Sequence, residues 1–153
     1  MSTPEDRLAE FGHTLPPVAA PAGAYVPAVR SGSLVWTSGQ LPFRDGLLPL
    51  TGKVGSAVTR EQANDLARTC TLNALAAIRA EVGELSAVRR VVKLVCFVAS
   101  EPAFTGQPGV ANGASELLGA VFGPAGQHAR SAVGVAVLPL DAPVEVELVV
   151  EVS

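Results

Sequence analysis

The pattern of apolar and polar residues is most regular between residues 59 and 83. Apolar side chains recur there at spacings of three and four residues: Ala63, Leu66, Ala67, Cys70, Ala74, Ile78 and Val82. This spacing places them on one face of a helix of about six turns. Thr59 and Gln62 have the spacing of a capping box, and Gly83 is placed as a C-cap. We therefore predict a helix over residues 59–82 whose alanine-rich face lies against a sheet.

Two apolar segments have the patterns of β-strands. Residues 91–99 are nearly all apolar, which predicts a central strand that is buried on both faces. In residues 144–152, glutamates alternate with valines and a leucine, and the first of these glutamates is Glu145. A period of two predicts a strand with one core face and one polar face.

Weaker patterns predict the remaining elements. They are a short helix over 4–11, strands over 25–30 and 34–40 joined by a turn, a loop over 41–58, a helix over 109–122 and a strand over 131–138. The order strand-strand-helix-strand-helix-strand-strand predicts an α+β sandwich with its helices on one side of the sheet. Because no helix is left for the other side, we expect subunit association to cover it. In this interpretation residues 1–19 form an N-terminal extension and residues 20–153 a single domain.

Composition adds an oligomeric state and a compartment to this picture. Of the 153 residues 48% are hydrophobic and 16% are charged, so little polar surface is available and an oligomer is favoured. The net charge is −3 and no basic cluster exceeds Arg89-Arg90, which argues against nucleic-acid binding. Residues 1–12 lack the apolar core of a signal peptide, and no apolar run is long enough to span a bilayer. Cys70 and Cys96 fall inside predicted elements, which favours buried free thiols over a disulfide. We therefore expect a cytoplasmic protein without a membrane segment.

Several motifs of cofactor chemistry are missing from the sequence. The two histidines, His13 and His128, have no partners at metal-ligand spacing. The glycines are scattered singly through turns and form no phosphate-binding loop. Ser38 lacks the preceding glycine of a nucleophile elbow. We therefore expect neither a metal nor another cofactor.

Two charged residues at strand ends are candidates for chemistry. Arg130 opens an apolar strand, where it is either a solvent-exposed side chain or a bidentate clamp for a carboxylate. Glu145 is either part of a solvated strand face or a carboxylate that positions water. If the last two strands formed a simple hairpin, these residues would lie about 20 Å apart along the strand. A shared site therefore needs a different strand order or a neighbouring subunit.

Two stretches of the chain resemble the signatures of the RidA/YjgF family. The first runs from Gly23-Ala24-Tyr25 through Trp36-Thr37-Ser38-Gly39-Gln40-Leu41-Pro42. The second runs from Ala129-Arg130-Ser131 through Leu138-Pro139 to Val144-Glu145-Val146-Glu147. The resemblance covers roughly residues 20–152 in one order.

The resemblance implies a chorismate-mutase-like fold, in which a mixed sheet is backed by two helices. It implies a homotrimer with a central barrel, whose last two strands are not neighbours in the sheet, and clefts between subunits that bind small carboxylic acids. Its site residues would be Arg130 as the carboxylate clamp, Glu145 beside a catalytic water, and Tyr25, Ser38, Gly39 and Asn112 around the pocket.

The activity that the resemblance implies is hydrolysis of enamines and 2-imino acids to 2-keto acids and ammonia, without a cofactor. Two alternatives stay open, a non-catalytic trimer that binds small carboxylates and an endoribonuclease or translation inhibitor. The chain departs from the family's pattern at Ala132, Gly134, Ser115 and His128. His128 either lines a modified pocket as a proton shuttle or caps a turn.

Overall fold

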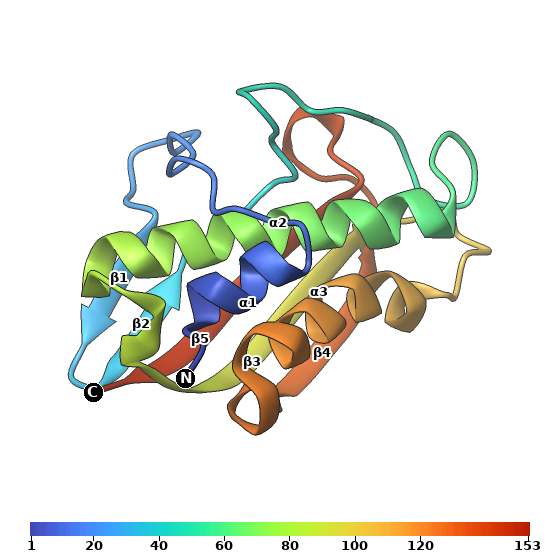
Figure 1. Ribbon diagram of the computed structural model, residues 1–153. Helices are drawn as coiled ribbons and strands as arrows, with labels where there is room; N and C mark the ends of the chain where they lie inside the picture. Colours follow the sequence, from blue (N-terminus) through green and yellow to red (C-terminus); the bar gives the residue numbers. More distant parts are fainter.

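The computed structural model describes all residues from 1 to 153. Its longest element is helix α2 (Arg60–Val82), whose buried face carries the apolar residues between 63 and 78. The predicted capping box is present, because Thr59 Oγ1 accepts from the Gln62 N–H at 3.1 Å and Gln62 Oε1 from the Thr59 N–H at 2.9 Å. Gly83 ends the helix at φ 92°, a conformation that costs a glycine little. The helix prediction is confirmed at both ends (Figure 1).

Five strands form one mixed sheet. They are β1 (Ala28–Ser31), β2 (Leu34–Thr37), β3 (Val88–Ala99), β4 (Ala129–Val135) and β5 (Val144–Val152). Their order is β1-β2-β5-β3-β4, and only β3 and β4 are parallel. Since β3 lies between β4 and β5, the last two strands are not neighbours and do not form a hairpin.

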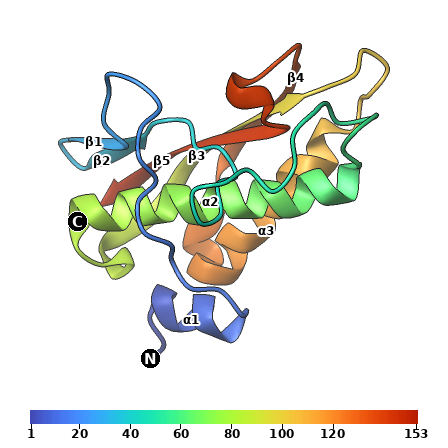
Figure 2. The ribbon, with the colours of Figure 1, turned by 90° about the horizontal axis from the view of Figure 1, so that it is seen from above.

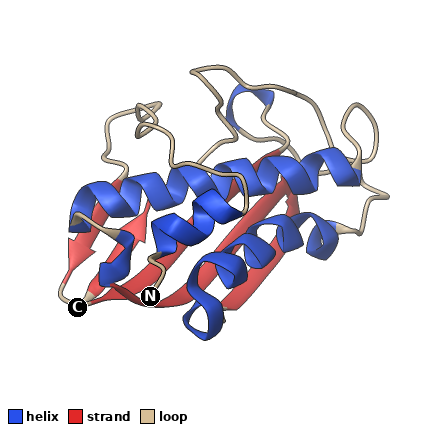
Figure 3. Ribbon diagram, viewed as in Figure 1, coloured by secondary structure: helices blue, strands red, loops and turns tan.

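Helix α2 and helix α3 (Gln107–Phe122) cover one face of this sheet (Figures 2 and 3). The alternating valines and Leu148 of β5 are buried beneath them, as the period of two predicted. No second layer covers the opposite face, where Trp36 is 51% exposed and Val95 and Phe97 are half-buried. The prediction that strand 91–99 is buried on both faces is therefore wrong within a single chain.

The short N-terminal helix α1 (Pro4–Glu10) confirms the helix expected over 4–11 and lies outside the helix pair (Figure 2). Leu8 is buried in the common core. Arg7 Nη1 donates to the Val121 carbonyl of α3 at 2.9 Å, and a Glu5 oxygen accepts from the Leu85 N–H at 2.8 Å. These contacts attach the N-terminal segment to the rest of the chain.

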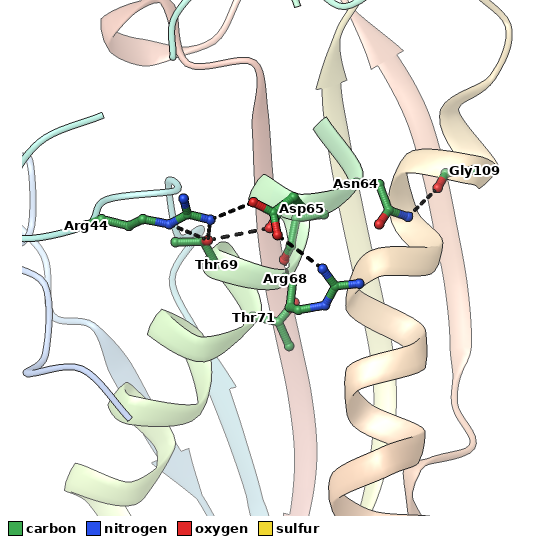
Figure 4. A network of polar contacts seen from close by, with 8 residues as sticks. Arg44, Asn64, Asp65, Arg68, Thr69, Thr71 and Gly109 are labelled. Carbon is green, nitrogen blue, oxygen red and sulfur yellow. Dashed lines mark hydrogen bonds and ion pairs between the residues drawn. The ribbon is translucent and has the colours of Figure 1, made fainter. Parts of the chain in front are cut away.

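Arg44 anchors the long loop between β2 and α2 (Figure 4). Its Nε donates to Thr69 Oγ1 at 3.0 Å and its Nη2 to Asp65 at 2.9 Å, both on α2. On the other side of α2, Asn64 Nδ2 donates to the Gly109 carbonyl of α3 at 2.8 Å. The loop, α2 and α3 are thus held in one arrangement by side-chain hydrogen bonds.

Strand ends differ from the sequence-based boundaries. The strand expected over 25–30 begins only at Ala28, because Tyr25 lies in a turn in which its N–H donates to the Gly23 carbonyl. The strand expected over 131–138 covers Ala129–Val135 instead, and the short 3-10 turn Pro139–Asp141 precedes β5. Turn hydrogen bonds at these positions replace the ladder that β-propensity alone suggests.

Both cysteines are free and buried, as predicted. Burial raises the pKa of the Cys96 thiol to about 12 and that of Cys70 well above its usual range. Such thiols are inert components of the core. None of the helices combines the length and the apolar character that crossing a lipid bilayer requires.

Candidate functional site

Arg130 lies on β4 and its side chain reaches helix α3. Its Nη1 donates to Asn112 Oδ1 at 2.8 Å and to Ser115 Oγ at 3.1 Å, and its Nη2 donates to the Pro108 carbonyl at 3.3 Å. Pro108, Asn112 and Ser115 are spaced by four and three residues, so they share one face of α3. That face holds the guanidinium in a fixed orientation.

The charge of Arg130 has no counter-ion within the chain. The three ion pairs of the structure involve Arg44, Arg60 and Arg68. An arginine carries five N–H groups, and the three hydrogen bonds of Arg130 leave two of them available. A positioned cation with unused donors in a planar fork is suited to bind a carboxylate.

His128 lies immediately before β4, and its side chain continues the hydrogen-bond network of Arg130. Its Nε2 lies 2.9 Å from Ser115 Oγ and its Nδ1 lies 2.6 Å from the Gly126 carbonyl oxygen. A carbonyl oxygen only accepts, so Nδ1 carries a proton, and in the neutral imidazole Nε2 accepts from the Ser115 hydroxyl. We refer to Arg130, Asn112, Ser115 and His128 as the clamp cluster.

Glu145 lies on β5 and points away from the helices. Its neighbours Val144 and Val146 are buried in the core, whereas Glu145 and Glu147 share the open face. Partial burial, and secondarily the negative charge of Glu147, raises the pKa of the Glu145 carboxyl above its ordinary value of 4.5. The carboxyl packs directly against Gly39, where an added Cβ would lie 2.7 Å from Glu145 Cδ.

Gly39, which contacts Glu145, connects that carboxyl to the segments that carry Ser38 and Tyr25. Ser38 Oγ donates to the Val26 carbonyl at 2.6 Å, which ties the loop after β2 to the segment before β1. Tyr25 accepts a hydrogen bond from the Ala22 N–H at 3.2 Å, and Tyr25 and Gly39 line the same small cavity. We refer to Glu145, Gly39, Ser38 and Tyr25 as the carboxylate cluster.

A single chain does not bring the two clusters together. Both residues pair with residues of the strand between them, β3. Arg130 pairs with the buried Leu94, and Glu145 pairs with Phe97, which lies on the open face. Two strand spacings and three residues along the strands separate their Cα atoms by roughly 14 Å. The observed strand order therefore shortens the separation that a hairpin would give, but the two side chains emerge on opposite faces of the sheet.

Ser115 is the site residue that the sequence did not single out for a role. Its position three residues after Asn112 on a predicted helix places both on one face, and that periodicity could have found it. No three His, Cys, Asp or Glu side chains lie close enough together to hold a metal ion.

Comparisons with known proteins extend over nearly the whole chain. The family model described as "YjgF/chorismate_mutase-like, putative endoribonuclease" matches residues 5–152. Protein TCP17 of Trypanosoma cruzi is 48% identical over 147 residues, which are 95% of this chain and 92% of that protein. The crystal structure of a putative endoribonuclease from Shewanella oneidensis is 36% identical, with a TM-score of 0.96 and coverage of 99% of this chain and 100% of that chain. The crystal structure of E. coli TdcF with bound serine is 26% identical, with a TM-score of 0.65 and coverage of 91% and 94%.

Proposed function

Because the chain belongs to the YjgF/RidA family, we propose that it binds small 2-imino and 2-keto acids and hydrolyses the imine to a 2-keto acid and ammonia. The observation that carries this proposal is the Arg130 guanidinium, which three hydrogen bonds hold in place while two N–H groups and the positive charge stay unpaired. The serine bound to TdcF is itself a small molecule with an α-carboxylate, which is consistent with such a ligand.

The chemistry requires no cofactor. A protonated imine is electrophilic at carbon, so water adds to the C=N bond once a base accepts one of its protons. Glu145 would be this base, and its raised pKa brings the group closer to neutral pH, where a general base is most effective. Glu145 then passes this proton to the amine nitrogen, and the C–N bond breaks as the new hydroxyl group gives its own proton back to Glu145, so that ammonia and the 2-keto acid leave.

In this proposal the active site lies between subunits of a homotrimer. Arg130 and Glu145 of one chain emerge on opposite faces of the sheet, so one small ligand contacts both only if a second subunit supplies one of them. The open sheet face, with exposed Trp36 and Val29, supplies apolar surface for such an association. The two buried free thiols favour a reducing compartment, the cytoplasm, for this activity.

The first test measures 2-keto acid release from freshly generated 2-iminobutanoate. We expect the wild-type protein to exceed the uncatalysed rate and to elute as a trimer in size-exclusion chromatography with light scattering. If turnover equals the uncatalysed rate while 2-oxobutanoate still binds, the protein is a non-catalytic carboxylate-binding member of the family. RNA cleavage that persists after Arg130→Ala would instead favour the endoribonuclease alternative.

The second test asks whether the two clusters come from different subunits. We expect Arg130→Ala and Glu145→Gln subunits to have little activity alone, but after unfolding and refolding together each type would supply the group that the other lacks. Random 1:1 mixing should restore about a quarter of the wild-type activity if the site is shared between subunits. No recovery in mixed trimers would contradict the shared site.

A further inference from the structure

We propose that Ser115 and His128 form a second catalytic unit, in which Ser115 is an activated nucleophile and His128 is its base. Its substrates would be small esters that carry a carboxylate. For the recognition of that carboxylate by Arg130 the inference rests on the proposed function, but it requires neither imine hydrolysis nor Glu145.

The hydrogen bonds around Ser115 have the order that an activated hydroxyl needs. Ser115 Oγ lies 2.9 Å from His128 Nε2, within the range found between nucleophiles and their bases. The Gly126 carbonyl, 2.6 Å from Nδ1, fixes the tautomer in which Nε2 is free to accept the Ser115 proton. The base is therefore oriented by a third group, as in other serine nucleophiles that depend on histidine.

Ser115 also has the exposure and the free electron pair that an attack requires. Both Ser115 and His128 are only half-buried, so a ligand at the surface of the clamp cluster can reach them. A hydroxyl oxygen has one proton and two lone pairs. The proton faces His128 and one lone pair accepts from Arg130 Nη1 at 3.1 Å, which leaves the second lone pair for an electrophile.

The reaction is an ordinary acyl transfer. Ser115 Oγ bonds to the ester carbonyl carbon while its proton moves to His128 Nε2. The C–O bond to the leaving alcohol then breaks, and His128 returns the proton to that alcohol. Water repeats the sequence on the acyl-serine and releases a free acid, so His128 and Ser115 end as they began.

Arg130 limits the substrate class. Its two unused N–H groups would hold the carboxylate, while Nη1 donates to Ser115 Oγ at 3.1 Å, so the bound carboxylate would lie near the nucleophile. The ester group must therefore lie within a few bonds of the carboxylate. Short half-esters of dicarboxylic acids satisfy this requirement.

The test compares mono-p-nitrophenyl succinate, which carries a carboxylate, with p-nitrophenyl acetate, which does not. We expect a burst of p-nitrophenol from the wild-type protein and, by peptide mass spectrometry, a succinyl group on Ser115. After the uncatalysed release from each ester is subtracted, the succinyl ester should react about 10- to 100-fold faster than the acetyl ester, because one charged hydrogen-bonded contact is added. Ser115→Ala should abolish the burst, and His128→Gln should slow it about 10²- to 10⁴-fold.

Ser86→Ala and His13→Gln are the matched controls, since Ser86 is an exposed serine that bonds only to Glu84 and His13 is the other histidine. Both should keep the wild-type burst. If no acyl group is found on Ser115 of the wild-type protein, or if the burst survives in Ser115→Ala, the dyad serves only to hold Arg130 and the inference is wrong. In that case 2-oxobutanoate binding that depends on Arg130 would still support the carboxylate clamp. Equal acylation of Ser115 by the two esters would contradict the substrate class and the clamp while the nucleophile stands.

Discussion

The two faces of the sheet differ in how far their charged side chains are held by hydrogen bonds. On the face covered by helices, Arg130 is held by Asn112, Ser115 and a backbone carbonyl, so the clamp cluster is complete within one chain. On the open face, Glu145 has no hydrogen-bond donor of its own, and partial burial raises its pKa. The clamp cluster is thus organised within one chain, whereas in the proposed trimer Glu145 gains its partner through association.

The pleat of the sheet explains this difference. Adjacent residues of a strand point to opposite faces, so register alone decides which face a side chain occupies. Arg130 shares the orientation of Leu94 beneath α3, and Glu145 shares the orientation of Phe97. A closed ring of subunits is the simplest way to bring two opposite faces to one ligand.

The largest effect is expected from removing the cation of the clamp cluster. Arg130→Ala should lower kcat/KM for 2-iminobutanoate and the affinity for 2-oxobutanoate by about 10²- to 10³-fold, because a charge-assisted contact is lost. Arg130→Lys should also be poor, since an ammonium cannot replace a planar bidentate fork. Steady-state kinetics and isothermal titration calorimetry measure these two losses.

Arg79→Ala is the matched control, because Arg79 lies on α2 and its side chain makes no ion pair. Its kinetics should equal those of the wild type. A folded Arg130→Ala protein with unchanged turnover would remove the clamp cluster from the proposed site, and the comparison of the two faces would lose its functional meaning.

The sequence predicted the helices and strands of both faces better than the contacts between elements that are distant along the chain. Periodicity predicted α2 with its caps and the alternation of β5, because these depend on local spacing. The helix period also places Asn112 and Ser115 on one face of α3. That this face meets Arg130 depends on the parallel pairing of β3 and β4, a long-range register that no local pattern encodes. The same register places Arg130 and Glu145 on opposite faces.

A smaller effect should follow from adding one methyl group to the open face. Gly39→Ala would place a Cβ 2.7 Å from Glu145 Cδ, so the carboxyl must move, while the backbone at Gly39 has no positive φ that excludes alanine. Displacement of the proposed general base should lower kcat about 10- to 100-fold. Binding of 2-oxobutanoate through the clamp cluster should change little.

Gly119→Ala provides the comparison, since a Cβ at this helical glycine meets no atom within 4 Å. It should keep full activity and gain up to about 1 kcal/mol of stability. If Gly39→Ala kept the wild-type kcat, the position of Glu145 would not matter for turnover.

The smallest effect concerns stability, and its sign follows from the raised pKa of Glu145. A carboxyl whose pKa is higher in the folded state contributes stability that is fully present below its unfolded value, near 4.5, and lost as the pH rises through the folded value. Glu145→Gln removes this loss, so the variant should melt above the wild type at pH 8, and the difference should shrink to zero by pH 4. Because Glu145 is half-exposed, we expect a gain in Tm of about 1–3 °C.

Thermal unfolding followed by circular dichroism measures this gain in Tm, with Glu151→Gln on the same strand as the control. A variant that melts below the wild type at pH 8 would mean that association gives the Glu145 carboxylate a positive partner, and the open face would then be completed by charge and not by apolar contact alone.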